Sequence, residues 1–218
     1  LSKINKVKST FKKYVSKNIV DKLLESEDSL NLGGTESEIT ILFSDIRGFT
    51  SMSEKLSPTQ IVKLLNKYFK SMIDVVFKFN GTLDKIVGDE LMVLYGVPLK
   101  SEDDTENAVK TAVQMFKSLD KFNERIIKDG FKPFKIGIGI NKGKAVSGNI
   151  GSDQQMNYTV IGDTINLGAR LCSHAKSGQI LISNSVKDVI GDNYDFKKIP
   201  KIEVKGKSKP IEVWSYMH

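Results

Sequence analysis

The chain has 218 residues, 39% of them hydrophobic, which is enough to bury a large core within one domain. No apolar run approaches the roughly 20 residues of a membrane span, and no secretory signal peptide is visible. Cys172 is the one cysteine, which excludes an intrachain disulfide and a cysteine-based zinc site. We therefore expect a cytosolic setting.

The net charge of +7 is concentrated near the start of the chain. Residues 1–22 carry seven lysines against one aspartate, and a second lysine cluster covers residues 197–209. Basic clusters can bind nucleic acid or anionic membranes, but a solvated face is the favoured interpretation of residues 1–22. Since no pattern of alternating aromatic and basic residues supports it, no nucleic-acid partner is predicted.

Helical segments are expected before the main domain. Apolar residues at positions 4, 7, 11 and 14 follow a heptad spacing that is too short for a coiled coil, and they indicate the end of a helix that enters from an upstream region. Ser16 is predicted to cap a second short helix. The inward residues of that helix would be Ile19, Val20, Leu23 and Leu24.

Residues 28–38 are polar and are interpreted as a linker. We therefore assign residues 1–35 to a helical lead-in and linker, and residues 36–218 to the main domain. The chain begins with Leu1 rather than methionine, so we expect a fragment of a longer protein.

The main domain alternates predicted strands and long helices. A strand over about 39–45 precedes Ser57-Pro-Thr-Gln60, a capping box with proline in the first turn, and an apolar stripe of helical period follows to Phe79. Further strands are predicted at 82–87, 90–96, 134–140 and 144–150, the last two paired around Asn141–Gly143. Further helices are predicted at about 103–129 and 163–175, before short strands and a helix to the end.

This order of elements predicts an α+β fold. Strand, helix, hairpin, helix and strand follow one another as in the ferredoxin-like βαββαβ core, with extensions. The sheet should be mostly antiparallel, with its helices packed on one face.

Two aspartates come at the ends of apolar, strand-like runs. Asp45 lies in Phe43-Ser-Asp-Ile-Arg-Gly-Phe-Thr50, and Asp89 lies in Lys85-Ile-Val-Gly-Asp89. Taken alone, either could belong to an ordinary turn. Two rigid carboxylates from adjacent strands can instead share a pair of divalent cations, as in nucleotide chemistry.

A third motif, Ile161-Gly-Asp-Thr-Ile-Asn166, opens a predicted helix. Asn166 and Arg170 are four residues apart, so they share one helix face, and such a pair suits a phosphate or a developing negative charge. A solvated arginine is the ordinary alternative. Because the neighbouring residues are largely apolar, we expect both side chains to lie in an apolar setting, where an unpaired arginine would be costly.

Taken together, the three motifs resemble the catalytic domain of class III nucleotidyl cyclases, the family of most adenylyl and guanylyl cyclases, over roughly residues 36–217. The resemblance implies that Asp45 and Asp89 hold two divalent cations, Mg²⁺ or Mn²⁺, with help from the carbonyl of Ile46. It also implies that backbone amides of Gly48, Phe49 and Thr50 face the triphosphate.

The resemblance further implies roles at the ribose, the phosphates and the base. Asn166 would orient the ribose, and Arg170 would stabilise charge on the α-phosphate. Lys205, or less favourably Lys207, would reach the terminal phosphates. Lys85 and Thr159 would read the purine, with Lys85 donating to adenine N1. Guanylyl cyclases of the family tend to have Glu and Cys at these two positions, whereas Thr is a frequent bacterial variant.

The implied activity is that of an adenylyl cyclase, which converts ATP to cyclic AMP and pyrophosphate. The alternatives are a guanylyl cyclase and a catalytically idle module that binds nucleotide or dimerises. The resemblance implies a homodimer whose sites are shared between chains, and an upstream regulatory domain in a parent protein. Membrane anchoring of that parent is left open.

Overall fold

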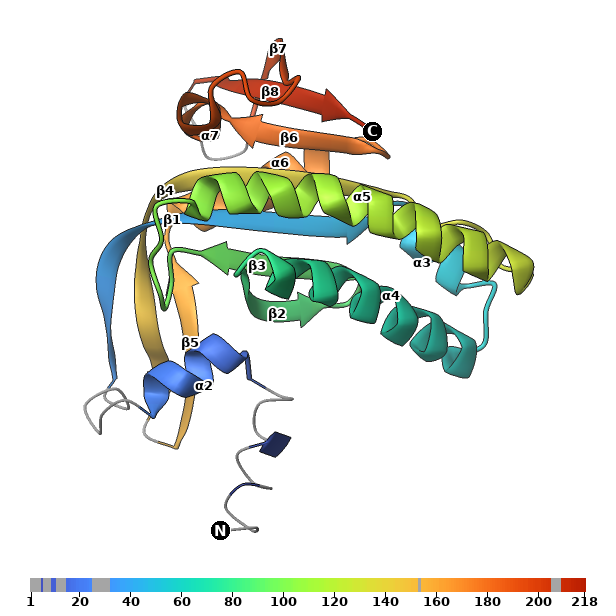
Figure 1. Ribbon diagram of the computed structural model, residues 1–218, viewed down its shortest axis with the longest axis horizontal. Coiled ribbons are helices and arrows are strands. Elements are labelled where there is room, and N and C mark those ends of the chain that lie inside the picture. Colours follow the sequence, from blue (N-terminus) through green and yellow to red (C-terminus); the bar gives the residue numbers. More distant parts are fainter. Residues whose placement is uncertain (1–4, 6–8, 11–14, 25–31, 153, 205–208) are drawn as a thin grey trace.

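The structure, a computed structural model, describes residues 5, 9–10, 15–24, 32–152, 154–204 and 209–218. Its helices and strands follow one another along the chain as drawn in Figure 1. They are α2 (Lys17–Leu23), β1 (Gly33–Ile46), α3 (Phe49–Ser53), α4 (Pro58–Lys78), β2 (Thr82–Val87), β3 (Glu90–Tyr95), α5 (Asp104–Lys128), β4 (Ile136–Ser152), β5 (Gln155–Ile161), α6 (Asp163–His174), β6 (Gln179–Ser183), α7 (Asn184–Ile190), β7 (Lys197–Ile202) and β8 (Ile211–Met217).

Within the described residues, the strands form one eight-stranded sheet in the order β2-β3-β1-β4-β6-β8-β7, with β5 paired to β4 outside this path. Every pairing is antiparallel except that between β4 and β6. The four strands β2, β3, β1 and β4, with α4 and α5, make the expected ferredoxin-like core. The mostly antiparallel α+β prediction is therefore confirmed.

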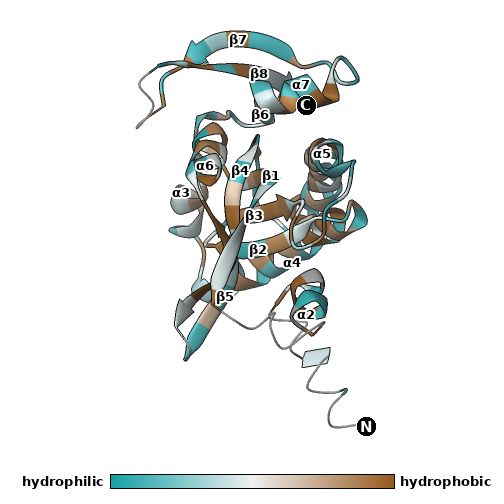
Figure 2. Ribbon diagram, turned by 90° about the vertical axis from the view of Figure 1, so that its left-hand side faces the viewer, coloured by the Kyte–Doolittle hydropathy of each residue, from teal (hydrophilic) through white to brown (hydrophobic). Residues whose placement is uncertain are grey.

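Helices cover both faces of this core, so the expectation of helices on one face was wrong. Leu42 and Ile46 of β1 pack with α4 and α5 on one side, whereas Ile41 and Phe43 pack beside α6 on the other. Figure 2 shows α6 and α5 on opposite sides of β1 and β4. Burial on both faces explains why this strand is an unbroken apolar run rather than an alternating one.

The two long helices follow their sequence signals closely. The amide of Ser57 donates to Gln60 Oε1 at 2.9 Å, and the amide of Gln60 donates to Ser57 Oγ at 3.3 Å, which completes the predicted capping box. The predicted inward residues of α5 are all buried: Ala108, Ala112, Met115, Phe116, Leu119, Phe122 and Ile126. Gly130, with φ of +84°, ends that helix as expected.

The predicted turn at Asn141–Gly143 does not exist, because β4 runs through it as one strand of 17 residues. Asn141 is buried, and its side-chain amide donates to the carbonyl of Thr164 at 2.8 Å. The lack of a side chain at Gly143 leaves room for Thr164, whose Oγ1 lies 2.7 Å from where a Cβ would be. Asn141 and Gly143 therefore position the start of α6 instead of forming a turn.

At the start of the chain, α2 has Ser16 at its N-cap position, without a capping hydrogen bond from the side chain. Ile19 and Val20 are buried as expected, whereas Leu24 is exposed. Residues 33–38, expected in a linker, form the first part of β1 and pair with β4. The heptad positions 4, 7, 11 and 14 lie outside the described residues. None of the helices described in this structure combines the length and hydropathy needed to cross a membrane.

Candidate active site

Asp45 and Asp89 lie side by side at one end of the core sheet. Asp45 is next to last in β1, and Asp89 is in the turn before β3, which pairs with β1 through Ser44 and Leu91. Burial, followed by hydrogen bonding and repulsion from the Asp45 carboxyl, raises the pKa of Asp89 to about 6. The backbone amide of Ile46 acts in the opposite direction.

The pair suits a hard divalent cation, whose preferred ligands are carboxylate and carbonyl oxygens. Two carboxyl groups in hydrogen-bond contact repel each other when both are ionised, and a bound cation would remove that repulsion. Among the described residues, no group of three or more His, Cys, Asp or Glu side chains is arranged to hold a metal. The candidate side-chain ligands are the two neighbouring carboxylates, Asp45 and Asp89.

Arg47 is a part of this site that the sequence reasoning missed. Its Nη1 lies 2.9 Å from Asp45 Oδ2, and its Nη2 donates to the carbonyl of Cys172 near the end of α6. The guanidinium lies against Gly137, the β4 residue paired with Asp45, where a side chain would collide with it. The arginine in the first motif was the available signal, but apart from Asp45 the residues that it contacts, Gly137 and Cys172, are distant in sequence.

The three residues expected at the triphosphate, Gly48, Phe49 and Thr50, come directly after Arg47 in the chain. Gly48 has φ of +71° and occupies the N-cap position of the five-residue helix α3, a conformation that favours glycine. Phe49 packs partly against the main core, and Thr50 is exposed. The turn into a helix predicted here is therefore present, and its first amides begin just beyond Asp45.

Helix α6 presents Asn166 and Arg170 on one face. The structure corrects the expected apolar setting in part, since Asn166 is exposed and Arg170 is half-buried. The helix lies close to β4 because Gly139 has no side chain, and a Cβ there would be 2.1 Å from the Cys172 nitrogen. No hydrogen bond or ion pair recorded among the described residues joins Asn166 or Arg170 to Asp45 or Asp89.

Lys85 and Thr159 meet although their strands, β2 and β5, are not paired in the sheet. Lys85 Nζ lies 3.4 Å from Thr159 Oγ1. Asp84, which the sequence reasoning passed over, contacts both: its Oδ2 is 3.1 Å from Lys85 Nζ and 3.2 Å from Thr159 Oγ1. The structure thus brings the two predicted base-reading residues together and adds a buried carboxylate to them.

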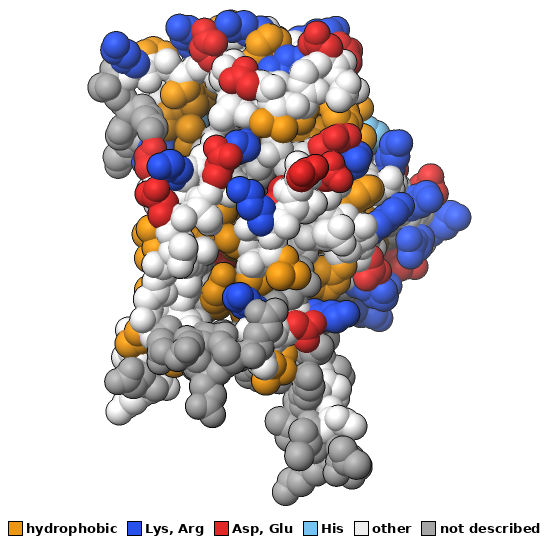
Figure 3. Space-filling view, turned by 60° about the vertical axis from the view of Figure 1, so that its left-hand side comes forward, with side chains coloured by type: hydrophobic (Ala, Val, Ile, Leu, Met, Phe, Trp, Pro, Cys, Tyr) orange, Lys and Arg blue, Asp and Glu red, His pale blue; other side chains and the backbone are white. Residues whose placement is uncertain are grey.

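Lys205 and Lys207 lie outside the described residues, so the choice between them stays a prediction. Exposed large apolar side chains occur on β2 and β5, the strands that carry Lys85 and Thr159, and on β4, which pairs with β5. They are Ile86, Val87, Val146, Met156 and Ile161, each between 37% and 58% exposed. Figure 3 shows hydrophobic side chains reaching the surface on the side of the molecule where β4 and β5 lie.

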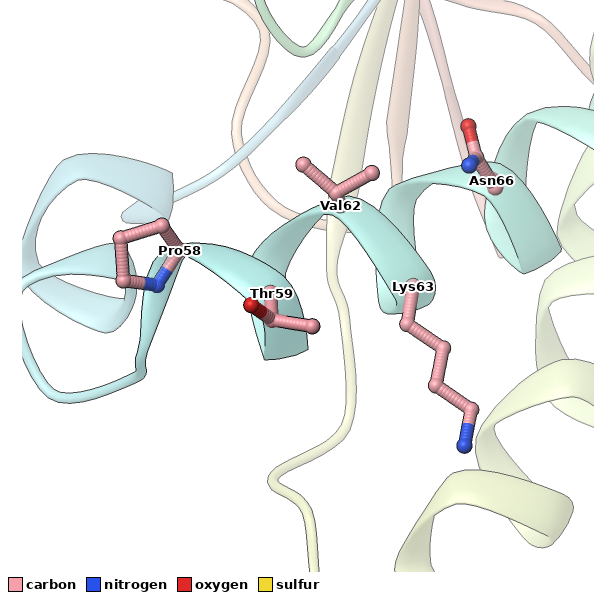
Figure 4. A pocket seen from close by; sticks show the side chains of 5 residues that line it. All are labelled: Pro58, Thr59, Val62, Lys63 and Asn66. Carbon is pink, nitrogen blue, oxygen red and sulfur yellow. The ribbon is translucent and has the colours of Figure 1, made fainter.

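A separate hollow lies along the outside of α4, lined by Pro58, Thr59, Val62, Lys63 and Asn66. In Figure 4 the side chains of Lys63 and Asn66 point away from each other. This hollow contains none of the predicted site residues, so it is not the candidate site.

Comparison with known proteins identifies the class of domain. Residues 34–217 match the family described as the adenylate and guanylate cyclase catalytic domain. The chain therefore belongs to the class III nucleotidyl cyclase family, as its three motifs predicted.

Two bacterial relatives extend this result. The chain is 32% identical to an adenylate cyclase of Anabaena cylindrica over 224 residues, which cover 98% of this chain and 44% of that protein. It is 30% identical to adenylate cyclase 1 of Rhizobium meliloti (strain 1021) over 207 residues, which cover 94% of this chain and 31% of the relative. The chain thus spans less than half the length of either protein.

Solved structures of both kinds of cyclase are similar to the chain. The guanylyl cyclase Cya2 has a TM-score of 0.82 and 41% identity, covering 84% of this chain and 93% of that one. The adenylyl cyclase CyaB from P. aeruginosa has a TM-score of 0.82 and 37% identity, covering 84% and 95%. Overall similarity therefore does not decide between ATP and GTP.

Proposed function

We propose that the chain is an adenylyl cyclase domain that converts ATP to 3′,5′-cyclic AMP and pyrophosphate. The observation that carries the choice of ATP is the contact between Lys85 Nζ and Thr159 Oγ1. A lysine ammonium can only donate hydrogen bonds, which suits adenine N1, an acceptor. Guanine N1 carries a hydrogen and would leave that donor unmatched.

The reaction is an intramolecular phosphoryl transfer. The ribose 3′-oxygen forms a bond to the α-phosphorus, the bond to the β-phosphate oxygen breaks, and pyrophosphate leaves with the electron pair while the hydroxyl proton passes to solvent. Divalent cations held by Asp45 and Asp89, with the Ile46 carbonyl, would supply neutralisation of the phosphate charge and a lower pKa of the 3′-hydroxyl.

The remaining roles fall to this chain's own side chains. Asn166 orients the ribose, and the Arg170 guanidinium stabilises the charge that develops on the α-phosphate. Lys205 neutralises the terminal phosphates, while the amides of Gly48, Phe49 and Thr50 face the triphosphate. No histidine is required as a base.

The active form in this proposal is a homodimer that shares each site between two chains. Within the described residues, the Asp45–Asp89 pair has no recorded contact with Asn166 or Arg170, which fits a site completed by a second copy. The exposed apolar side chains on β2, β4 and β5 supply a surface that a second copy would cover. We also propose that an upstream regulatory region controls this dimer in a longer parent protein, with the catalytic domain in the cytoplasm.

A guanylyl cyclase is the second candidate, because Cya2 is 41% identical to the chain. An idle nucleotide-binding or dimerisation module is less favoured, since such modules typically lack a metal-binding aspartate or the catalytic arginine, and Asp45, Asp89 and Arg170 are all present.

The test is to incubate the purified domain at high concentration with Mn²⁺ and either ATP or GTP, and to identify the products. We expect cyclic AMP from ATP, and much less cyclic GMP from GTP. Cyclic GMP as the main product would establish the guanylyl alternative, and no cyclic nucleotide from either substrate would contradict the enzyme proposal.

A further inference from the structure

Asp84 is a buried carboxylate at the base-reading end of the site. Its side chain is 1% exposed, whereas that of Lys85 is 47% exposed. A shift in the strand register between Leu83 and Lys85 lets Asp84 reach the same partners as its neighbour. Asp84 Oδ2, Lys85 Nζ and Thr159 Oγ1 form a triangle with sides of 3.1, 3.2 and 3.4 Å.

The chemistry of these three groups fixes the direction of every hydrogen bond in the triangle. An ionised carboxylate only accepts, an ammonium only donates, and a hydroxyl has one proton to donate and two lone pairs. The Thr159 hydroxyl must therefore give its proton to Asp84 and accept one from Lys85. Lys85 retains a third N–H, and Thr159 retains one lone pair, for a ligand.

We infer that Asp84 is a positioning residue that makes Thr159 an acceptor toward the nucleotide base, an inference that rests on the proposed cyclase activity. With Asp84 in place, the pair offers a donor from Lys85 next to an acceptor from Thr159. Adenine carries the complementary groups on neighbouring atoms, with an acceptor at N1 and a donor in the 6-amino group. A threonine, which by itself could accept or donate, thereby becomes selective for adenine.

Guanine presents the reverse pattern, with a hydrogen on N1 and an acceptor at O6. Against the fixed triangle, the donor of Lys85 would face a donor, and the acceptor of Thr159 would face an acceptor. Neither mismatch can be relieved by rotating the Thr159 hydroxyl, because its proton is engaged by Asp84. Unmatched polar groups in a closed site are the strongest means by which a protein rejects a similar substrate.

A purely structural role does not explain why residue 84 is an aspartate. An apolar residue could join β2 to β5 without the cost of burying a carboxylate. Asp84 Oδ1 is also buried without a hydrogen-bond partner among the described groups. The carboxylate is thus retained although the burial is unfavourable, and its contacts go to the two residues proposed to read the base.

The experiment compares Asp84→Asn with the parent chain, using ATP, GTP and purine riboside triphosphate, which lacks the 6-amino group. For the parent we expect kcat/KM to be several-fold to about tenfold higher with ATP than with the analogue, the worth of one hydrogen bond. In Asp84→Asn the Thr159 proton is no longer committed, so the hydroxyl can donate to guanine O6 as well as accept from the 6-amino group of adenine. The ATP-to-GTP ratio should fall by about fivefold or more.

Thr159→Val provides the second arm and keeps the test decisive if Asp84→Asn folds poorly. It removes the hydroxyl while keeping the shape, so it should lose the preference for the 6-amino group even with Asp84 present. In the double variant, Asp84→Asn should add no further loss of that preference. Asp74→Asn is the control, since Asp74 pairs with Lys70 at 2.8 Å on the exposed face of α4 and should leave both ratios unchanged.

The outcomes separate this inference from the proposed function. If the parent makes no cyclic nucleotide, the proposed function fails. If the parent makes cyclic AMP and discriminates by the 6-amino group, but folded Asp84→Asn keeps the parental ATP-to-GTP ratio, the inference about Asp84 is overturned alone. Full discrimination in Thr159→Val would overturn it equally.

Discussion

The β2–β3 hairpin carries two aspartates in opposite electrostatic situations. Asp84 is paired with the ammonium of Lys85 and the hydroxyl of Thr159, whereas Asp89 faces another carboxylate, Asp45. Burial raises the pKa of both groups, but the next cause differs: Lys85 lowers the pKa of Asp84, and Asp45 raises that of Asp89 further.

This contrast separates two uses of a carboxylate. A carboxylate that the chain itself neutralises can orient neighbouring side chains, as we infer for Asp84. A carboxylate left beside a like charge is suited to a cation that comes from outside the chain. The predictions below test whether the phosphate end (Asp45 and Asp89) and the base end (Asp84, Lys85 and Thr159) differ in this way.

The largest effect is expected at the phosphate end. Asp45→Ala or Asp89→Ala should lower turnover by about 1,000-fold or more, because loss of a metal ligand removes several kcal/mol of charge stabilisation and each 1.4 kcal/mol is about tenfold. Both variants should stay folded: Asp89→Ala removes a repulsive pair, whereas Asp45→Ala also loses the ion pair with Arg47 and should be somewhat less stable. Cyclase assays and urea unfolding of each variant measure the two effects. Near-parental turnover in either variant would show that the metal assignment is wrong.

The next effect concerns how the phosphate end of one chain is combined with Asn166 and Arg170 of α6. If Asp45 and Asp89 of one chain work with Asn166 and Arg170 of another, Asp45→Ala and Arg170→Ala should each be inactive as homodimers. A mixed dimer has one site with both lesions and one site with neither. Mixing should restore activity, to about half of the parental sites at most when every dimer is mixed.

Activity of the parent should also fall on dilution if the dimer is required. Light scattering or native mass spectrometry should first show that mixed dimers form. A mixture that stays inactive although they form would require the catalytic set to close within one chain.

A smaller effect is expected from reversing the base end. Lys85→Glu with Thr159→Cys should shift the ATP-to-GTP ratio of kcat/KM toward GTP by about tenfold or more, since an unmatched buried polar group costs about 1–3 kcal/mol. Lys85 also neutralises Asp84, so its replacement affects stability as well as the choice of nucleotide. The double variant should therefore be less stable than the parent, and adding Asp84→Asn should restore part of that loss. An unchanged nucleotide ratio in folded protein would exclude these residues as base readers.

The smallest effect is expected for Arg47, the chain's own cation at the phosphate end. Arg47→Ala removes charged hydrogen bonds to Asp45 and to the Cys172 carbonyl, so the free energy of unfolding should fall by about 1–3 kcal/mol. Arg47→Lys keeps the charge but not the forked geometry, and it should recover only part of the loss. Equal stability of Arg47→Ala and the parent in urea unfolding would remove the structural role assigned to this ion pair.

Local signals in the sequence predicted local structure correctly. The capping box at Ser57 and the glycine that ends α5 were both predictable, because each depends on residues within a few positions of one another. The turn predicted at Asn141–Gly143 was wrong, because these turn-forming residues lie inside a strand. There the start of α6 satisfies the buried Asn141, and only the folded chain brings the two segments together.

The sequence by itself determined the family, the strand-end positions of Asp45 and Asp89, and the shared helix face of Asn166 and Arg170. These follow from motifs and from the periods of strands and helices, which are properties of neighbouring residues. Tertiary structure alone decided that Asp84 joins Lys85 and Thr159, because Thr159 lies 74 residues beyond Lys85 on a strand that does not pair with β2. The folded chain alone also decided that Arg47 connects Asp45 to the end of α6. Long-range contacts of this kind depend on how the sheet packs, and no local pattern of residues encodes them.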